Sequence, residues 1–257
     1  MADVTLTYKG STIAEMSDTG TKTLKTAGKY CEGDIGVSYV KPESGVTSGF
    51  WDEDTARALV SNRFSLTSIT FPSGITKIDR YAFAGCNKLE LASLPEGIAS
   101  IDDYAFKDCF RLSLTSLPST IKVINEYSFS GCIDLSLTSL PDGITKIETG
   151  AFSGCINLSL TSLPENIKTI NQRVFDRCTN LSLTSLPASI ETIDHWAFNA
   201  CTGLTSITFK GTPTSISIYA FQDCTNLTTI NVPWAEGAVA KAPWGAKNAT
   251  INYNYTE

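Results

Sequence analysis

The amino-acid sequence predicts a solenoid, in which copies of one short repeat stack along a common axis. Three residue types recur every 23 positions over most of the chain, and a fixed period of this length is typical of stacked repeats. Within one period the apolar positions follow neither the helical spacing of about 3.6 residues nor the strand spacing of about 2, which indicates short extended pieces separated by turns. The recurring residues are Phe83, Phe106, Phe129, Phe152, Phe175, Phe198 and Phe221, then Cys86, Cys109, Cys132, Cys155, Cys178, Cys201 and Cys224, and a Leu three positions after each Cys, from Leu89 to Leu227.

The composition argues against several other classes of protein. Of the 257 residues, 42% are hydrophobic and 18% are charged, which favours a folded chain over a disordered one. The net charge is -6 with no block of Lys or Arg, so no nucleic-acid binding is expected. No apolar run approaches the roughly 20 residues that span a bilayer, so no membrane insertion is expected. The start, MADVTLTYKG, has no basic region followed by an apolar one, so no secretory signal is expected in this sequence.

Residues 1–43 are predicted to form a small β module. Short runs rich in Thr, Val and Ile, such as VTLTYKG and STIAEM, alternate with polar turns that contain Gly, a pattern typical of antiparallel strands. A segment of about 40 residues is near the lower limit for independent folding. We therefore expect this module to lean on its neighbour or on another copy.

Residues 44–65 are predicted to form a linker and a helical N-terminal cap. A polar stretch rich in Gly and Ser is followed by FWDEDTARALVSNRFS, in which Asp52 or Asp54 can cap a helix. Counting back one period from the first Cys gives Arg63, so this segment reads as a degenerate first coil. Terminal repeats need an atypical outer face, and Trp51 would cover the exposed end of the core.

Residues 66–233 are predicted to be the repeats. A Pro near the end of the apolar run lacks an N–H and ends a strand there. A polar residue after the second Ile can cap a brief helical turn that carries the Ala-Phe pair. The five middle coils read LELASL or LSLTSL whereas the outer ones read LTSITF or LTTINV, and this one-residue shift predicts a local backbone adjustment in the middle coils. The Pro residues are Pro72, Pro95, Pro118, Pro141, Pro164 and Pro187, and the polar positions are Asp79, Asp102, Asn125, Glu148, Asn171, Asp194 and Ser217.

Residues 234–257 are predicted to form a C-terminal cap. Trp234 and Trp244 are large enough to cover the last open coil, and ATINYNY reads as a final strand. Covering both ends of the stack would suppress edge-to-edge association.

The coils share the pattern L-x-x-I-x-[LF]-P-x-x-[IV]-x-x-I-x-x-x-A-F-x-x-C, which resembles the BspA-like leucine-rich repeats of bacterial surface and host-associated proteins. The pattern covers about two-thirds of the chain. This resemblance implies a leucine-rich-repeat solenoid, a right-handed coil of short parallel strands, and roles in adhesion or protein binding. The family often has Gly after the second Ile, where this chain mostly has Asp or Asn.

The two ends carry a second resemblance. TLTYKGSTIAEMSDTGTKTLKTAGKYCEGDI and VPWAEGAVAKAPWGAKNATINYN look like segments attached to such repeats in gut-bacterial, often prophage-borne, structural proteins. This would account for the missing leader, because virion parts leave the cell by lysis.

The recurring Cys residues favour a buried row of free thiols over a metal or disulfide site. Zinc sites use pairs of the CxxC kind or clusters of Cys and His, and the sequence has neither. Side chains stacked from coil to coil point in parallel, whereas a disulfide needs converging Cβ vectors. A free buried Cys behaves as a small hydrophobe. Cys31, which stands outside the period, is the expected exception.

No catalytic residue, metal ligand or cofactor is predicted. His195 is the only His and has no recurring partner nearby that would make it a general base. The acidic residues after the second Ile form a row that calcium would suit, but helix capping explains them more simply. No Ser/His/Asp, Cys/His or paired-carboxylate arrangement can be assembled, so we do not expect an enzyme.

The candidate binding residues form what we call the aromatic row, one residue per coil immediately before the Ala-Phe position. Outward aromatic side chains on a rigid scaffold are typical anchors for sugar rings or protein surfaces. The alternative is that they only pack on their neighbours as part of the scaffold. The row consists of Tyr81, Tyr104, Tyr127, Gly150, Arg173, Trp196 and Tyr219.

These observations predict a non-enzymatic binding or adhesion protein that presents a rigid repeat surface to a protein or glycan. The alternative is a structural component of a virion or prophage, docked through its N-terminal β module. Either role implies a location outside the cell, at its surface or on a virion. The oligomeric state and the face that binds stay open.

Overall fold

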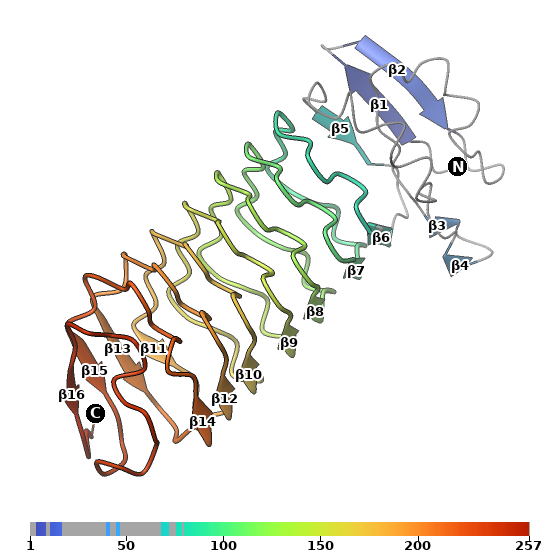
Figure 1. Cartoon of the computed structure of the whole chain (residues 1–257). Coiled ribbons are helices and arrows are strands. Elements are labelled where there is room, and N and C mark those ends of the chain that lie inside the picture. Colours follow the sequence, from blue (N-terminus) through green and yellow to red (C-terminus); the bar gives the residue numbers. More distant parts are fainter. Residues whose placement is uncertain are drawn as a thin grey trace.

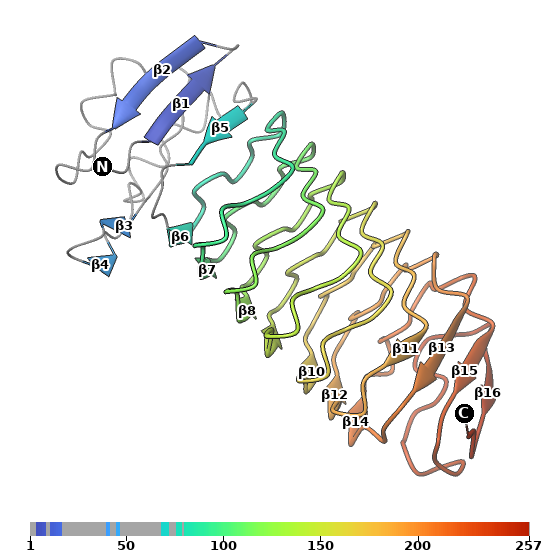
Figure 2. The same cartoon turned by 180° about the vertical axis from the view of Figure 1, so that it is seen from behind.

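The computed structural model describes residues 4–8, 11–16, 40–41, 45–46, 68–71, 76–78 and 80–256. From β6 (Lys77–Ile78) onward the coils lie one after another along a single axis, as Figures 1 and 2 show from opposite sides. The chain is a parallel β-solenoid, the fold class that the 23-residue period predicts.

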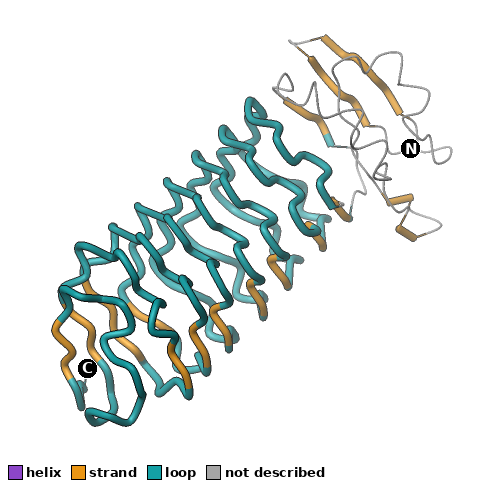
Figure 3. Tube along the Cα trace, in the orientation of Figure 1, coloured by secondary structure: helices purple, strands orange, loops and turns teal. Residues whose placement is uncertain are grey.

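One side of the solenoid is a ladder of two-residue strands, drawn in orange in Figure 3. Partners along the ladder are parallel and lie 23 residues apart, as in the pairing of Ile170 with Ile193 and of Ile193 with Ile216. The Ile of each strand is buried and the residue before it points outward, because successive strand residues face opposite sides. Pairing along this side falls into three groups, β6–β7, β8–β9 and β10–β12–β14. The strands are β6, β7 (Ser100–Ile101), β8 (Val123–Ile124), β9 (Lys146–Ile147), β10 (Thr169–Ile170), β12 (Thr192–Ile193) and β14 (Ser215–Ile216).

A second parallel sheet forms only in the C-terminal coils. It has the order β11–β13–β15–β16, and its outermost strand belongs to the last coil. β13 and β15, whose coils carry the LTSITF and LTTINV sequences, are longer than the strands of the first ladder, whereas β11 lies in an LSLTSL coil and has two residues. The strands are β11 (Ser185–Leu186), β13 (Ser206–Phe209), β15 (Thr229–Asn231) and β16 (Thr250–Asn252).

Of the five middle coils, only that of β11 contributes a strand to this sheet. The amide of Thr208 in β13 donates to the carbonyl of Thr184, whereas the amide of Ser136 in a middle coil donates to the carbonyl of Leu114. The two bonds start at different positions of the repeat and span 24 and 22 residues. Leu112 and Leu114 are both buried in the middle coil that contains them.

The prediction of brief helical turns is wrong, since the described residues contain no helix. Tight turns stand there instead, closed by bonds such as Ala105 N to the carbonyl of Asp102. Every second amide in this segment, for example that of Phe106, donates a hydrogen bond to the next coil and not to its own coil. In addition, Tyr104 has a φ of 59°, in the left-handed region. A helix needs consecutive right-handed residues and internal bonds, so it cannot propagate through this segment.

Three of the polar residues predicted to cap those turns connect neighbouring coils, whereas Glu148 pairs with Lys146 of its own coil. Asn125 and Asn171 donate through Nδ2 to the carbonyls of Ile101 and Ile147 in the preceding coil, both at 2.7 Å. Asp102 pairs with Lys77 at 2.7 Å. Asp79 lies outside the described residues.

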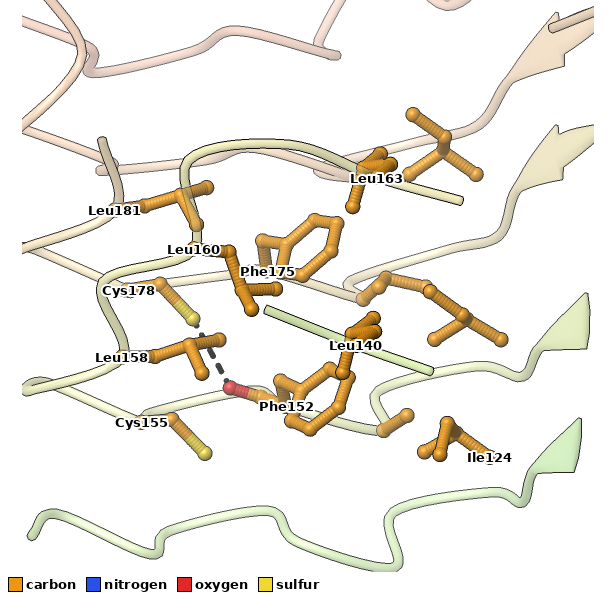
Figure 4. Close-up of a cluster of buried hydrophobic side chains, with 14 of the residues drawn as sticks. Ile124, Leu140, Phe152, Cys155, Leu158, Leu160, Leu163, Phe175, Cys178 and Leu181 are labelled. Atoms are coloured by element: carbon orange, nitrogen blue, oxygen red, sulfur yellow. Dashed lines mark hydrogen bonds between the residues drawn. The ribbon is translucent and has the colours of Figure 1, made fainter. Parts of the chain in front are cut away.

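The core is built from rows of identical side chains. Consecutive Phe rings from Phe83 to Phe221 stack with centroids 5.0 to 5.9 Å apart and interplanar angles of 15° or less. Figure 4 shows Phe152 and Phe175 in this stack beside the Leu and Cys rows. All seven Phe side chains are fully buried, and each contributes about 1.5–3 kcal/mol through burial.

The seven Cys residues of this row are buried free thiols. From Cys109 onward each Sγ–H donates to the carbonyl of the Phe 26 residues earlier, at 2.9 to 3.1 Å, as Figure 4 shows for Cys178 and Phe152. The same carbonyl accepts the amide of the Cys in its own coil, for instance Cys86 N on Phe83 at 3.0 Å. The thiols therefore join successive coils inside the apolar core. Cys31 lies outside the described residues.

The N-terminal strands are antiparallel. β1 (Val4–Tyr8) pairs with β2 (Ser11–Met16) and with β5 (Ser68–Thr70), and β3 (Val40–Lys41) pairs with β4 (Gly45–Val46). The predicted helical cap, with Trp51 and Arg63, lies outside the described residues, as do residues 17–39. The division of the chain into the segments 1–43, 44–65, 66–233 and 234–257 stays a prediction.

At the C-terminal end, two Trp side chains lie against the last coils. Trp234 and Trp244 are buried, with ring centroids 5.3 and 6.1 Å from that of Phe209. Trp244 Nε1 donates to the carbonyl of Ala240 at 2.8 Å. The ATINYNY segment contains β16, which extends the second sheet by one strand.

Candidate functional site

The aromatic row runs along one edge of the solenoid, where the chain turns from the strand ladder toward the Phe row. In the coil of β7, the turn from Asp102 to Ala105 places Tyr104 at its third position, the position at which a type II turn needs a positive φ. This conformation costs a non-glycine residue about 1 kcal/mol or more. The left-handed members are Tyr81 (φ 60°), Tyr104 (59°), Tyr127 (49°), Gly150 (62°), Arg173 (56°) and Trp196 (57°).

The rings of the row lie face to face along the solenoid axis. The centroids of Tyr81 and Tyr104 are 4.9 Å apart, those of Tyr104 and Tyr127 are 5.2 Å apart, and both pairs are nearly parallel. Trp196 and Tyr219 stack at 6.0 Å. The ring faces are therefore largely covered by their neighbours, and the edges face solvent. The end members Tyr81 and Tyr219 are 37% and 41% exposed.

Cationic side chains flank the Tyr part of the row. The guanidinium of Arg80 lies over the rings of Tyr81 and Tyr104, with its central carbon 5.1 and 5.7 Å from the ring centroids. Lys107 Nζ lies 5.8 Å from the centroid of Tyr104. Burial, with a smaller contribution from the neighbouring Tyr81 and Glu126, raises the pKa of Tyr104. The Tyr104 phenol is therefore a neutral hydrogen-bonding group at physiological pH.

The row is interrupted at Gly150. On one side the ring of Tyr127 leans over this glycine, since a Cβ placed on Gly150 would lie 2.2 Å from Tyr127 Cε1. On the other side the guanidinium of Arg173 lies on the ring of Trp196, with 4.7 Å between its central carbon and the ring centroid. Trp196 is fixed in turn by a hydrogen bond from Nε1 to Gln222 Oε1 at 3.1 Å.

With this geometry in place, comparison with known proteins gives the family. The model of the BspA type leucine rich repeat region matches six copies, over residues 57–182 and 124–236. The chain belongs to the BspA-type leucine-rich repeat family. Comparison with curated proteins gives no match.

Several solved structures are similar to this BspA-type chain. A leucine rich cell surface protein from Faecalibacterium prausnitzii is 23% identical with a TM-score of 0.46, over 68% of this chain and 62% of that one. A leucine rich repeat protein from T. pallidum is 29% identical with a TM-score of 0.46, over 65% and 78%. A leucine-rich repeat protein from Bacteroides ovatus is 18% identical with a TM-score of 0.39, over 85% and 75%.

Two alternatives to the aromatic row were His195 as a catalytic group and the acidic residues after the second Ile as a metal site. His195 is exposed, and its ring centroid lies 6.0 Å from that of Trp196 and 5.8 Å from that of Tyr219. It is thus a neighbour of the aromatic row. Among the described residues, no group of three or more His, Cys, Asp or Glu side chains is arranged to hold a metal ion. A search of the same residues for a helix that could cross a bilayer finds none.

The sequence reasoning missed an exposed apolar stripe on another edge. Phe110, Ile133 and Ile156 each follow a Cys in three consecutive coils, and Phe110 and Ile156 are 41% and 40% exposed. The signal was available, since the other coils carry Asn or Thr at this position.

Proposed function

We propose that this chain is a non-enzymatic binding protein that presents the rigid surface of its BspA-type repeats to a protein partner, in an adhesion role at a cell surface. The observation that carries the proposal is the aromatic row. Its side chains are Tyr, Arg and Trp, the three residue types that dominate hot spots in protein interfaces. They project from a scaffold whose core consists of stacked, fully buried side chains.

The stacking favours a protein partner over a glycan. A sugar ring binds an aromatic side chain by lying on its open face. In the aromatic row the faces of Tyr104 and Trp196 are covered on both sides by neighbouring side chains. What remains available is a line of ring edges and polar tips, which suits the mixed apolar and hydrogen-bonding contacts of a protein surface.

The same stacking lowers the entropy that binding must overcome. A rotamer-rich side chain loses about 0.5–1.5 kcal/mol when an interface immobilises it. Rings that already contact a neighbour on each face have little of this freedom left. The row is therefore organised for binding before a partner arrives.

The proposal is tested by screening protein and glycan arrays with the wild-type chain and the Tyr104→Ala/Tyr127→Ala variant. We expect a protein ligand whose affinity falls at least about 30-fold in the variant, since hot-spot residues contribute about 2 kcal/mol or more. The matched control is Thr138→Ala/Thr161→Ala, which removes two exposed side chains on the two coils that follow, away from the row. Equal binding by the wild type and the Tyr variant would show that the row is scaffold only.

The virion-component alternative depends on the segment 1–43, of which residues 17–39 lie outside the described part. Deletion of residues 1 to 45 would separate the two ideas. Loss of assembly with retained ligand binding supports docking through that segment, whereas unchanged assembly removes this alternative.

A further inference from the structure

One member of the aromatic row has no side chain although its backbone is the same as that of the others. Gly150 has a φ of 62°, within 3° of Tyr81 and Tyr104, and its amide donates to the next coil through the carbonyl of Gln172 at 2.9 Å. Tyr stands at the equivalent position four times in this chain, and Tyr81, Tyr104 and Tyr127 have the same left-handed backbone as Gly150. The break is thus a missing ring in a stack that continues on both sides.

The two groups that border the break each have one uncovered face. Tyr127 stacks on Tyr104 with one face, and its other face leans over Gly150 and meets no ring among the described residues. Arg173 lies on Trp196 with one face of its guanidinium. Its side chain is exposed, and the salt bridges found among the described residues do not include it.

The spacing of the coils matches the thickness of one planar group. Tyr127 and Arg173 belong to coils that are two steps apart, and each step of a parallel ladder is about 4.8 Å. Within the row itself, neighbouring rings are separated by 4.9 to 6.0 Å, one ring per coil. Two steps separate the levels of Tyr127 and Arg173 by about 9.6 Å, and the Tyr127 ring, which leans over Gly150, takes up part of this space and has to tilt back to admit one further ring.

We propose that this break, which we call the Gly150 gap, receives one aromatic side chain of the protein partner, stacked between Tyr127 and Arg173. Tyr127 offers an offset-stacking face. Arg173 offers a cation that forms no salt bridge within the described part of the chain, and a cation is attracted to the electron-rich face of a ring. A carboxylate would form a salt bridge with Arg173 but would not stack on Tyr127, and Arg173 would repel a Lys or Arg. An aromatic ring is therefore the group that can interact favourably with both Tyr127 and Arg173. This inference rests on the proposed function and names the chemistry of the partner.

The test uses the full chain labelled with ¹⁵N and the probe N-acetyl-tryptophanamide. We expect saturable upfield shifts of the Gly150 amide and the Arg173 Nε–H, because protons above a ring face are shielded. N-acetyl-leucinamide, adenosine and methyl glucoside serve as comparison probes. Equal shifts with adenosine or the glucoside would contradict an aromatic side chain as the occupant, and no shift with the Trp probe would overturn the gap as a docking position.

Two variants sharpen the result. Gly150→Tyr completes the stack from within once the whole Tyr127 ring tilts away from its present place over Gly150, and it should weaken probe binding at least tenfold while circular dichroism shows that the protein stays folded. Gly154→Ala is the matched control, since it adds a methyl group to another left-handed glycine of the same coil at ordinary contact distance. If Gly150→Tyr leaves the probe shifts unchanged, the gap is not where the probe binds.

The outcome also separates this inference from the proposed function. A protein ligand that depends on Tyr104 and Tyr127 but binds Gly150→Tyr as well as wild type overturns the gap and leaves the proposed function standing. Probe shifts at Gly150 without any protein ligand on the array would contradict the proposed function instead.

Discussion

The Cys thiols connect the coils one residue at a time. Each thiol from Cys109 onward donates to a Phe carbonyl of the preceding coil, in a core from which water is excluded. Burial is the main cause that raises the pKa of these thiols, for Cys224 to about 12 from its ordinary value of 9.0. The folded chain therefore keeps thiol protons that the unfolded chain releases in mildly alkaline solution.

This difference predicts a loss of stability at alkaline pH. Below pH 9 both states hold the thiol proton and the contribution is fully present. Above pH 9 the unfolded state loses the thiol proton first. Each thiol from Cys109 onward therefore lowers the free energy of unfolding by about 1.4 kcal/mol per pH unit, for Cys224 up to about pH 12. Urea unfolding of the reduced protein between pH 8 and 11 measures this. In Cys224→Ala the free energy of unfolding should fall less steeply with pH, by the contribution of one thiol. The Tyr and Lys residues are the same in both proteins, so their titration does not affect the comparison. Equal slopes would contradict the prediction.

The structural element of this chain is a single coil. Each coil is stabilised by packing against the neighbouring coils. Neither the two-residue strands nor the tight turns bury an apolar face by themselves. The Phe rings show this most directly, since Phe152 has a ring 5.7 Å away on one side and another 5.9 Å away on the other. Removal of one ring therefore affects three coils.

Phe152→Ala is expected to lower the free energy of unfolding by about 3–5 kcal/mol, through lost burial and the cavity left between Phe129 and Phe175. Phe152→Leu, which keeps much of the volume, should cost clearly less. Chemical denaturation followed by circular dichroism measures both. A loss below about 1 kcal/mol for the Ala variant would show that the Phe row does not support the stack.

The coil also shows where prediction from sequence succeeds and where it stops. Phe, Cys and Leu recurring every 23 residues leave few folds other than a stack, and the members of the aromatic row follow from the same period. The helical turn was predicted wrongly because Tyr, Arg and Trp rarely adopt a positive φ, so their sequence carries no signal for it. The ring faces buried within the row could not be foreseen either, since they depend on side-chain torsions set by the adjacent coil.

The whole molecule is quasi-one-dimensional. In the described solenoid, hydrogen bonds between coils connect residues 20 to 26 positions apart, so each coil is bonded mainly to its two neighbours. The ion pair of Lys210 with Glu165, which spans two coils, is an exception. Stability in such a protein is approximately the sum of repeats and of the contacts between adjacent repeats. The number of coils can therefore change without a change of fold.

Deletion of residues 135–157, one full period, should give a folded protein with an unchanged type of circular dichroism spectrum and a lower free energy of unfolding. Deletion of residues 135–145, about half a period, should prevent folding because the Phe and Cys rows lose register. The full-period deletion also brings Tyr127 and Arg173 into adjacent coils, so it should abolish binding of the Trp probe. Unfolding of the full-period variant would contradict the repeat description.

The segment LSLTSLP occurs unchanged in four consecutive coils, at residues 112–118, 135–141, 158–164 and 181–187. Repeats of this kind are sites at which misaligned recombination between gene copies inserts or removes one whole unit. Such an event would leave the Phe and Cys rows intact and would move the Gly150 gap relative to the ends of the molecule by one coil. Selection could then alter the spacing of binding positions along the chain in fixed steps, with no need to redesign the core each time.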